Sequence, residues 1–318
     1  MKSSFDITIV GGGIAGLTLA ALLATSRHAD SLHVTVIDAA KRPAFRSDSD
    51  IALRVSAIAN GSAELFDSIG VWNAVTAARI SPYEHMRVWD ESDLPDSASA
   101  LTFDAAEFAV PQLGFIVENV LLQNALLDRL ETTDARLEFE SRLDGLPTAD
   151  LLIGADGARS FVREQAGIKT HRWPYQQTAV VTHLETEKPH GATAWQRFLR
   201  AGPLGMLPLA DGRISVVWST TPDIAKQAMA ATDAELASML TTASDRVLGE
   251  LRVAGPKGAF PLSAQHADEY VRPGLALIGD AAHAIHPLAG QGANLGLQDA
   301  AELASVITAA LDEGLHPG

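Results

Sequence analysis

The feature of this sequence that most restricts its fold is a glycine cluster, GGGIAG at residues 11–16, which directly follows a short β-branched run. Residues 7–10 have the composition of a buried strand, and from Ile14 onward the apolar residues take helical spacing. A second β-rich run occupies residues 33–37. Strand, glycine turn, helix and strand form a β-α-β unit whose strands are expected to lie parallel. The sequence therefore predicts an α/β chain that begins with a Rossmann-like domain.

Three of these glycines have separate predicted roles in binding a dinucleotide. Gly11 permits the tight turn, Gly13 lets the backbone approach a pyrophosphate, and Gly16 lets the helix pack on the strand. The first N–H groups of the helix, including that of Ala15, are free to bind the anion. Asp38 ends the second strand, where its carboxylate can accept hydrogen bonds from an adenosine ribose. This motif alone does not separate FAD from NAD.

Two kinds of apolar pattern in the rest of the chain predict two kinds of sheet. Residues 151–155 and 275–279 are fully apolar, which is typical of strands buried in a parallel sheet. Between them, residues 178–183, 193–199 and 213–220 are β-branched and alternating, with glycine, proline and aspartate at the turns. We therefore predict a Rossmann-like nucleotide-binding domain with a parallel sheet and a substrate domain with a mainly antiparallel sheet.

The predicted domain boundaries follow from where one apolar pattern changes to the other. The Rossmann-like domain is expected to be discontinuous and to take residues 1–75, 111–170 and 268–318, while the substrate domain takes residues 76–110 and 171–267. The periodicity also predicts helices at residues 56–69, 119–130 and 293–311, and strands at residues 85–89 and within residues 136–151.

The composition of the chain excludes several classes of partner and of chemistry. The formal net charge of −15 argues against nucleic acid as a partner, because binding phosphates needs a basic surface. The chain contains no cysteine, so disulfides and thiolate chemistry are excluded and redox chemistry must come from a bound cofactor. His283 and His286 have the spacing of metal ligands but no third ligand nearby, so we expect no metal site. Glycines interrupt the apolar stretch of residues 7–24, which favours a cytoplasmic enzyme over a secreted one.

Charged residues follow the apolar strand in LIGADGARSFVR, residues 152–163. Asp156 comes directly after the strand, at the edge of a parallel sheet where ligands bind. Arg159 and Arg163 are expected on the next turn of helix. The alternative is an ordinary loop in which Asp156 caps that helix.

The most specific stretch is ALIGDAAHAIHPLAGQGANLGLQDA, residues 276–300. A strand leads into Asp280, and a loop rich in glycine and proline then opens a long helix. This pattern is a second dinucleotide-type cradle, and one elongated cofactor can contact both cradles.

Together these three motifs resemble the flavoprotein aromatic hydroxylases, which are single-component FAD monooxygenases. The resemblance implies that Asp280 holds the ribityl chain of FAD and that backbone N–H groups of the following loop face the isoalloxazine ring. A helix N-terminus suits the anionic reduced flavin. The cofactor-binding residues that it implies in this loop are Pro287, Gly290, Gly292, Ala293 and Asn294.

Shorter stretches are similar to one branch of that family, the ubiquinone-biosynthesis hydroxylases, in the same order over nearly the whole chain. By this resemblance Arg54 and Gln123 are expected near the FAD, with a surface arginine and an ordinary helix glutamine as the alternatives. The stretches are LRVSAI at 53–58, PYEHMRVWD at 82–90, LGFIVEN at 113–119, TAWQRFL at 193–199 and GPLGMLPL at 202–209.

The reaction that the resemblance implies is hydroxylation of the aromatic ring of a polyprenyl phenol in ubiquinone biosynthesis. NADH or NADPH reduces the FAD, oxygen forms a flavin C4a-hydroperoxide, and one oxygen atom passes to the ring. No acid or base residue is predicted for this chemistry. Two alternatives stay open: an FAD oxidoreductase that does not hydroxylate, and a non-catalytic flavin-binding subunit of a biosynthetic complex.

The resemblance also implies more chain beyond the helix that ends near Leu311, whereas this sequence ends at Gly318. We therefore expect part of the apolar face of residues 293–311 to be uncovered. An uncovered apolar face predicts a homo-oligomer, a place in a ubiquinone-biosynthesis complex or loose attachment to the inner face of the membrane, and little hydroxylase activity.

Overall fold

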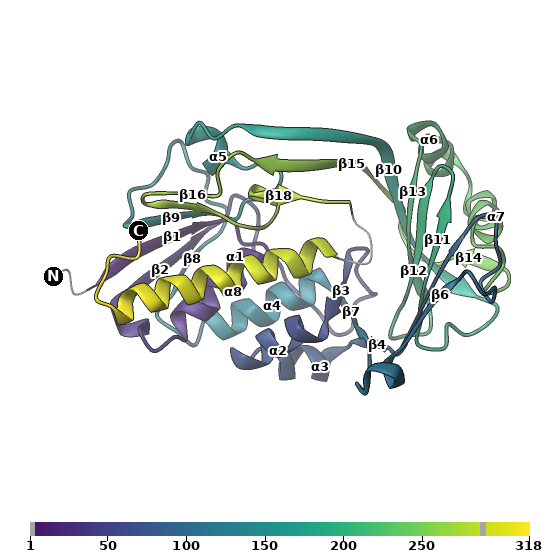
Figure 1. Cartoon of the computed structure of the whole chain (residues 1–318), viewed down its shortest axis with the longest axis horizontal. Coiled ribbons are helices and arrows are strands. Elements are labelled where there is room, and N and C mark those ends of the chain that lie inside the picture. The colour runs from purple at the N-terminus through teal and green to yellow at the C-terminus, as the bar shows by residue number, and fades with distance from the viewer. Residues whose placement is uncertain (1–3, 287–290) are drawn as a thin grey trace.

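The computed structural model describes residues 4–286 and 291–318, and its elements are arranged around three sheets (Figure 1). A six-stranded sheet lies at the end of the molecule that holds both termini, and a larger sheet stands at the opposite end. The long strands β10 (Thr170–Thr186) and β15 (Gly258–Ala267) run from one end to the other. The predicted α/β class, with a parallel sheet and a mainly antiparallel sheet, is confirmed.

The six-stranded sheet contains the predicted β-α-β unit. Its central strand, β1, pairs in parallel with β2 on one side and with β9 on the other. Because parallel strands point the same way, the loops after β1, β2, β9 and β17 all meet at one edge of this sheet. Only the edge strand β16 runs antiparallel to its neighbour. In sheet order the strands are β16 (Val271–Arg272), β17 (Leu275–Leu277), β9 (Leu151–Gly154), β1 (Phe5–Val10), β2 (Leu32–Ile37) and β8 (Arg136–Glu138).

Helix α1 (Ile14–Ala24) packs against both α4 (Asn119–Leu130) and α8 (Gln291–Asp312). These helices share one apolar core with the six-stranded sheet, and Leu17, Leu19 and Leu23 of α1 are fully buried in it. A helix enclosed by a sheet and two other helices needs apolar residues on several sides. This requirement explains the near-continuous apolar sequence of α1.

Helix α8 turns its apolar residues inward. Ala300 and Ile307, from the predicted apolar face, are buried, whereas Leu303 is half-buried against the same core. Val306, which also lies within the predicted apolar stretch 293–311, is on the outer side of the helix with 55% of its surface exposed. Among residues 4–286 and 291–318, no helix is both long and apolar enough to cross a membrane.

The larger sheet has one face covered by helices α6 (Pro222–Ala230) and α7 (Asp233–Ala243). Side chains alternate along its strands, so Val216 and Trp218 face these helices while Val217 faces the other way, toward the six-stranded sheet. Neighbouring strands of this sheet pair antiparallel, except that β5 and β11 pair in parallel. In sheet order the strands are β18 (His283–Ala284), β15, β10, β13 (Ile214–Thr220), β12 (Gly202–Pro208), β11 (Thr193–Leu199), β5 (His85–Asp90) and β6 (Leu101–Asp104), and β14 (Leu251–Val253) pairs with β10.

A small third sheet corrects one sequence prediction. The predicted helix at residues 56–69 is wrong in its first turn, because β3 (Val55–Ala59) pairs with β7 (Gly114–Glu118). Helix α2 (Asn60–Ser68) begins only after this strand. The remaining elements are β4 (Ser81–Tyr83), which also pairs with β7, helices α3 (Trp72–Ala78) and α5 (Phe161–Gln165), and short 3-10 turns at Ala29–Ser31, Ala105–Phe108 and Gly279–Ala281. The domain boundaries stay a prediction.

Candidate functional site

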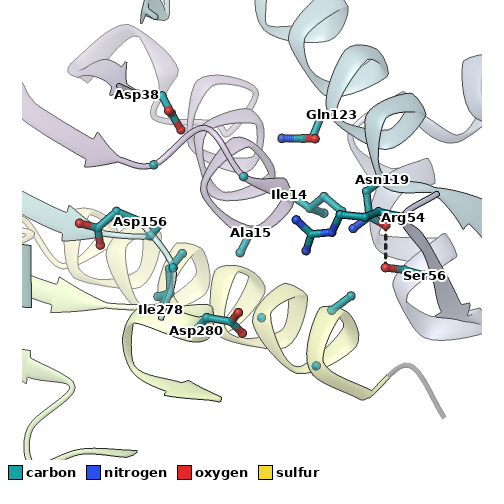
Figure 2. Close-up of a pocket in the computed structure, with 18 of the residues that line it drawn as sticks. Ile14, Ala15, Asp38, Arg54, Ser56, Asn119, Gln123, Asp156, Ile278 and Asp280 are labelled. Carbon is teal, nitrogen blue, oxygen red and sulfur yellow. Dashed lines mark hydrogen bonds between the residues drawn. The ribbon is translucent and has the colours of Figure 1, made fainter. Parts of the chain in front are cut away.

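A pocket of about 1230 Å³ opens where the carboxyl ends of the parallel strands face the larger sheet. Its lining includes Asp38 after β2 and Asp280 after β17 (Figure 2). Val217 of β13 also lines it. Pockets for small molecules more often enclose roughly 300–1,000 Å³. The size and extent of this pocket suit a ligand with two ends.

The glycine loop after β1 forms the floor of the pocket. Gly11 has φ +118°, and a Cβ there would lie 2.2 Å from the carbonyl oxygen of Ala155. Gly13 differs, because a Cβ on it would meet no atom within 4 Å. Gly16 lies against the loop, since its Cβ would come within 2.1 Å of the Gly11 carbonyl oxygen. Gly11 and Gly16 are therefore needed where backbone segments pack closely against each other, whereas Gly13 leaves the backbone open to the pocket.

Asp38 and Gln123 hold this loop from opposite sides. One Asp38 carboxylate oxygen accepts a hydrogen bond from the Gly12 N–H at 2.6 Å, and the other accepts from the Ala40 N–H at 2.7 Å. The Gln123 side-chain amide donates to the Gly12 carbonyl at 3.0 Å. Both side chains line the pocket beside Ala15 (Figure 2).

In the loop after β9, Asp156 has the capping role and also lies at the pocket. One carboxylate oxygen accepts from the Val162 N–H at 3.1 Å and so helps to cap α5, while the other is buried and has no partner among the described residues. Asp156 and Arg159 line the pocket. Arg163 does not, because it is buried and donates to the carbonyls of Ala281 and Ala158. Desolvation in this position lowers the pKa of the Arg163 guanidinium.

The loop after β17 places a carboxylate opposite this floor. Asp280 points into the pocket (Figure 2), and the loss of solvent around it raises its pKa, with His283 and Arg54 acting in the opposite direction. Asp299 of α8 fixes this loop, because its carboxylate accepts from the Gly279 N–H at 2.8 Å and lies 2.6 Å from Nε2 of His283. Sequence reasoning missed Asp299.

The far end of the pocket combines a cation with apolar walls. The Arg54 guanidinium extends into the pocket (Figure 2) and has no hydrogen-bond or ion-pair partner within residues 4–286 and 291–318. Ser56 donates to the Asn119 side chain at 2.7 Å on the same wall. Leu207 and Val217 close this end from the larger sheet. Sequence reasoning did not single out Ser56, Asn119 or these two apolar residues.

The start of α8 accounts for the remaining predicted residues. Gly292 and Ala293 line the pocket. Asn294 instead tethers β3 and α2, since its side chain accepts from the Ala59 N–H and the Ser62 hydroxyl and donates to the Ala57 carbonyl. The predictions for Pro287 and Gly290 lie outside the described residues.

The two histidines considered as metal ligands have other partners. Nε2 of His283 lies against Asp299, and Nε2 of His286 lies 3.0 Å from the side-chain oxygen of Gln177. Across the described part of the chain, no three histidine, aspartate or glutamate side chains are grouped to hold a metal ion.

These residues fit a flavin dinucleotide. Gly13 leaves room for a pyrophosphate at the start of α1, where the helix offers free N–H groups. Two carboxylates, Asp38 and Asp280, stand at separate places along one pocket, as two sets of sugar-type hydroxyls require. Asp156 adds a buried acceptor without a partner. A mononucleotide would occupy only part of this space.

Comparison with known proteins agrees with this fit. Residues 128–316 match the model of an FAD binding domain, and residues 9–67 match a model of an NAD(P)-binding Rossmann-like domain. The fold is that of PqsL from Pseudomonas aeruginosa, a probable FAD-dependent monooxygenase, with a TM-score of 0.77 at 23% identity over 98% of this chain and 88% of that one. The family model and the site therefore define an FAD-binding protein with this fold.

The similarity to curated proteins shows to which family of FAD-dependent enzymes the chain belongs. The chain is 40% identical to the 3-demethoxyubiquinol 3-hydroxylase of Escherichia coli, over 97% of this chain and 81% of that protein. It is 38% identical to the ubiquinone hydroxylase UbiL of Rhodospirillum rubrum, over 98% of this chain and 74% of the relative, and 32% identical to the human mitochondrial ubiquinone biosynthesis monooxygenase COQ6, over 99% and 79%. The chain belongs to the ubiquinone-biosynthesis FAD hydroxylase family, as its sequence motifs predicted.

Asp38 is expected to contribute to FAD binding. We expect Asp38→Ala to weaken FAD binding about 10-fold, the lower end for a lost charge-assisted hydrogen bond, because one side of this carboxylate is open to solvent. Asp38→Asn should lose less, since its amide oxygen can still accept from the Gly12 N–H. Titration of apoprotein with FAD, followed by flavin fluorescence, measures both. Asp30→Ala is the control, because Asp30 is exposed and lies just before the start of β2, away from the loop that follows this strand. An Asp38→Ala affinity within twofold of the parent contradicts the assignment.

Proposed function

We propose that this protein hydroxylates the aromatic ring of a polyprenylated phenol or quinol on the route to ubiquinone, with FAD as cofactor and NADH or NADPH as reductant. The observation that carries this proposal is the 40% identity to 3-demethoxyubiquinol 3-hydroxylase over 97% of the chain. The pocket supports it, because its far end is walled by apolar side chains of the larger sheet.

In this proposal the residues of the pocket bind and orient rather than react. Gly13 and Ala15 present backbone N–H groups to the pyrophosphate, Asp38 accepts from the ribose, and Asp280 accepts from the ribityl hydroxyls. Arg54 supplies a positive charge close to the ring end. Bound FAD supplies the reduction and oxygen chemistry, so no protein acid, base or nucleophile is required.

The apolar walls give the substrate ring its place. Leu207 and Val217 on the larger sheet line this end of the pocket and would exclude water from a bound ring. Excluding water protects reactive species from hydrolysis and strengthens the electrostatic interactions inside the site. An electron-rich ring lying on these residues is held without a charged contact.

The absorbance spectrum of the purified protein, followed by NAD(P)H addition, tests the proposal. We expect a bound flavin spectrum, bleaching by NAD(P)H under anaerobic conditions, and a product 16 mass units heavier than the polyprenyl phenol when oxygen is admitted. Hydrogen peroxide without a hydroxylated product would instead identify a non-hydroxylating oxidoreductase. A protein that binds FAD but is not reduced by NAD(P)H would be a flavin-binding subunit.

The lipid nature of this substrate also bears on location and assembly. We propose a cytoplasmic protein that attaches loosely to the inner face of the membrane, within a complex or as a homo-oligomer. Co-sedimentation with anionic liposomes, and the sedimentation coefficient without them, test these two points separately.

A further inference from the structure

Residues 49–52 form the segment that leads into Arg54, and the backbone of this segment is anchored beside the small third sheet. The Arg79 guanidinium donates to two of its carbonyls, at 2.8 and 3.3 Å. Arg79 also pairs with the buried carboxylate of Glu118 on β7, at 2.6 Å. Glu118 in turn accepts from one N–H group of the segment at 2.7 Å. These contacts fix the segment from one side only.

The side chain of Asp50 attaches the same segment to the larger sheet. It forms an ion pair with Arg213, which lies in the turn between β12 and β13. The Arg213 side chain is 15% exposed, and it also donates to the Asp211 carboxylate at 2.8 Å and to the Ala254 carbonyl at 2.6 Å. Because these contacts already order the arginine, little further entropy is lost when it pairs with Asp50.

This ion pair joins the two walls of the pocket at its far end. On one wall, Arg54 follows Asp50 by four residues. On the other wall, Leu207 and Val217 belong to the two strands that the Arg213 turn connects. The distance between the walls therefore depends on a contact that lies outside the pocket lining.

The surroundings of the ion pair allow it to be removed without unfolding the segment. Ile51 is buried in a small apolar cluster that includes Leu209, which precedes the Arg213 turn, and this packing does not need the ion pair. The Asp50 side chain is 64% exposed, so its loss leaves no buried carboxylate partner behind in the segment. Replacing Asp50 should therefore shift the segment rather than unfold it.

We propose that Asp50, through Arg213, is a positioning residue that sets where the Arg54 guanidinium stands in the pocket. Arg54 has no hydrogen-bond or ion-pair partner within residues 4–286 and 291–318, so its place depends on the backbone that carries it (Figure 2). A cation at this end of the pocket stabilises the negative charge of a reduced flavin. This inference rests on the proposed function, since it assumes that FAD occupies the pocket.

The reduction potential of bound FAD tests the proposal, because two effects of Asp50→Ala have opposite signs. Loss of a negative charge by itself favours the reduced flavin and raises the potential, whereas displacement of Arg54 lowers it. We expect the potential to fall, with FAD affinity within about fivefold of the parent, the range of a surface ion pair. Arg54→Ala should lower the potential on its own, and adding Asp50→Ala to it should cause no further fall.

Asp48→Ala is the matched control, because Asp48 is an exposed carboxylate two positions away whose partner, Arg46, is close by in the sequence. It removes the same charge without touching the larger sheet, so its potential should not fall. Hydrogen exchange of the apoprotein gives a readout without flavin: Arg213→Ala should speed exchange in residues 51–54 and leave β7 at the parent rate.

A potential that rises or stays unchanged in Asp50→Ala, or that falls equally in the Arg54→Ala background, overturns the positioning role while leaving the proposed function intact. Unchanged exchange of residues 51–54 in Arg213→Ala shows that the ion pair does not hold the segment, and it overturns the inference too. If the parent protein binds no FAD, the proposed function fails and this inference fails with it.

Discussion

Asp280→Ala is expected to be purified largely without FAD, with affinity reduced by about 150-fold, the upper end for losing a charged hydrogen-bond acceptor. The large effect follows from the surroundings of this carboxylate. Low solvation raises its pKa, and the same low solvation strengthens any hydrogen bond that it accepts. Asp38 has a smaller expected effect, because both of its carboxylate oxygens already accept hydrogen bonds from backbone N–H groups. Flavin content after dialysis, and a Kd from titration of the apoprotein, measure the difference.

Asp280→Asn removes the negative charge of the side chain but keeps its size, so it tests the contribution of the charge to FAD binding. Its amide oxygen still accepts a hydrogen bond, so we expect an affinity between those of the parent and the alanine variant. Glu302→Ala, on the exposed side of α8, is the control. Because the raised pKa protonates Asp280 at a higher pH than an ordinary aspartate, FAD affinity should fall on acidification, and Asp280→Asn should lack that fall. Full flavin occupancy of Asp280→Ala at limiting FAD would show that the carboxylate does not hold the cofactor.

The parts of the site that the sequence predicted are those in which the signal is local. The glycine loop and Asp38 directly follow a strand, and Asp280 lies in the turn after β17. The carboxyl ends of parallel strands must meet at one edge. Strand β11 was predicted with its observed limits because its turn residues and alternation lie within a few positions of it. No tertiary information was needed for these features.

The parts that escaped prediction depend on contacts between distant segments. Residues 55–59 have alanine-rich, helix-like spacing, yet they form a strand because residues 114–118 offer a pairing partner. Such tertiary pairing overrides local propensity. Asp299 could not be assigned from its position, since its link to Gly279 depends on the rotation of α8 about its axis. Asn294 lies beside the predicted flavin loop, but its side chain points to β3 for the same reason.

The strongest test of the glycine loop compares Gly11 with Gly13, which lie two positions apart and should fail in different ways. In Gly11→Ala the new methyl group would overlap the Ala155 carbonyl, in a backbone conformation with φ +118° that alanine disfavours. We expect a loss of at least about 2 kcal/mol in unfolding free energy even without cofactor. FAD binding should be lost with it, because the turn no longer forms.

In Gly13→Ala the new methyl group meets nothing in the protein, and φ is −74°, which alanine adopts readily. The apoprotein should therefore stay within about 1 kcal/mol of the parent, the usual range for such a change at a helix N-cap. FAD affinity should still fall at least about 10-fold, because the methyl group occupies the space through which the pyrophosphate approaches the helix. Thermal denaturation of both apoproteins, paired with FAD titration, gives the comparison. Unchanged FAD affinity in a stable Gly13→Ala protein would mean that the pyrophosphate does not lie at this helix.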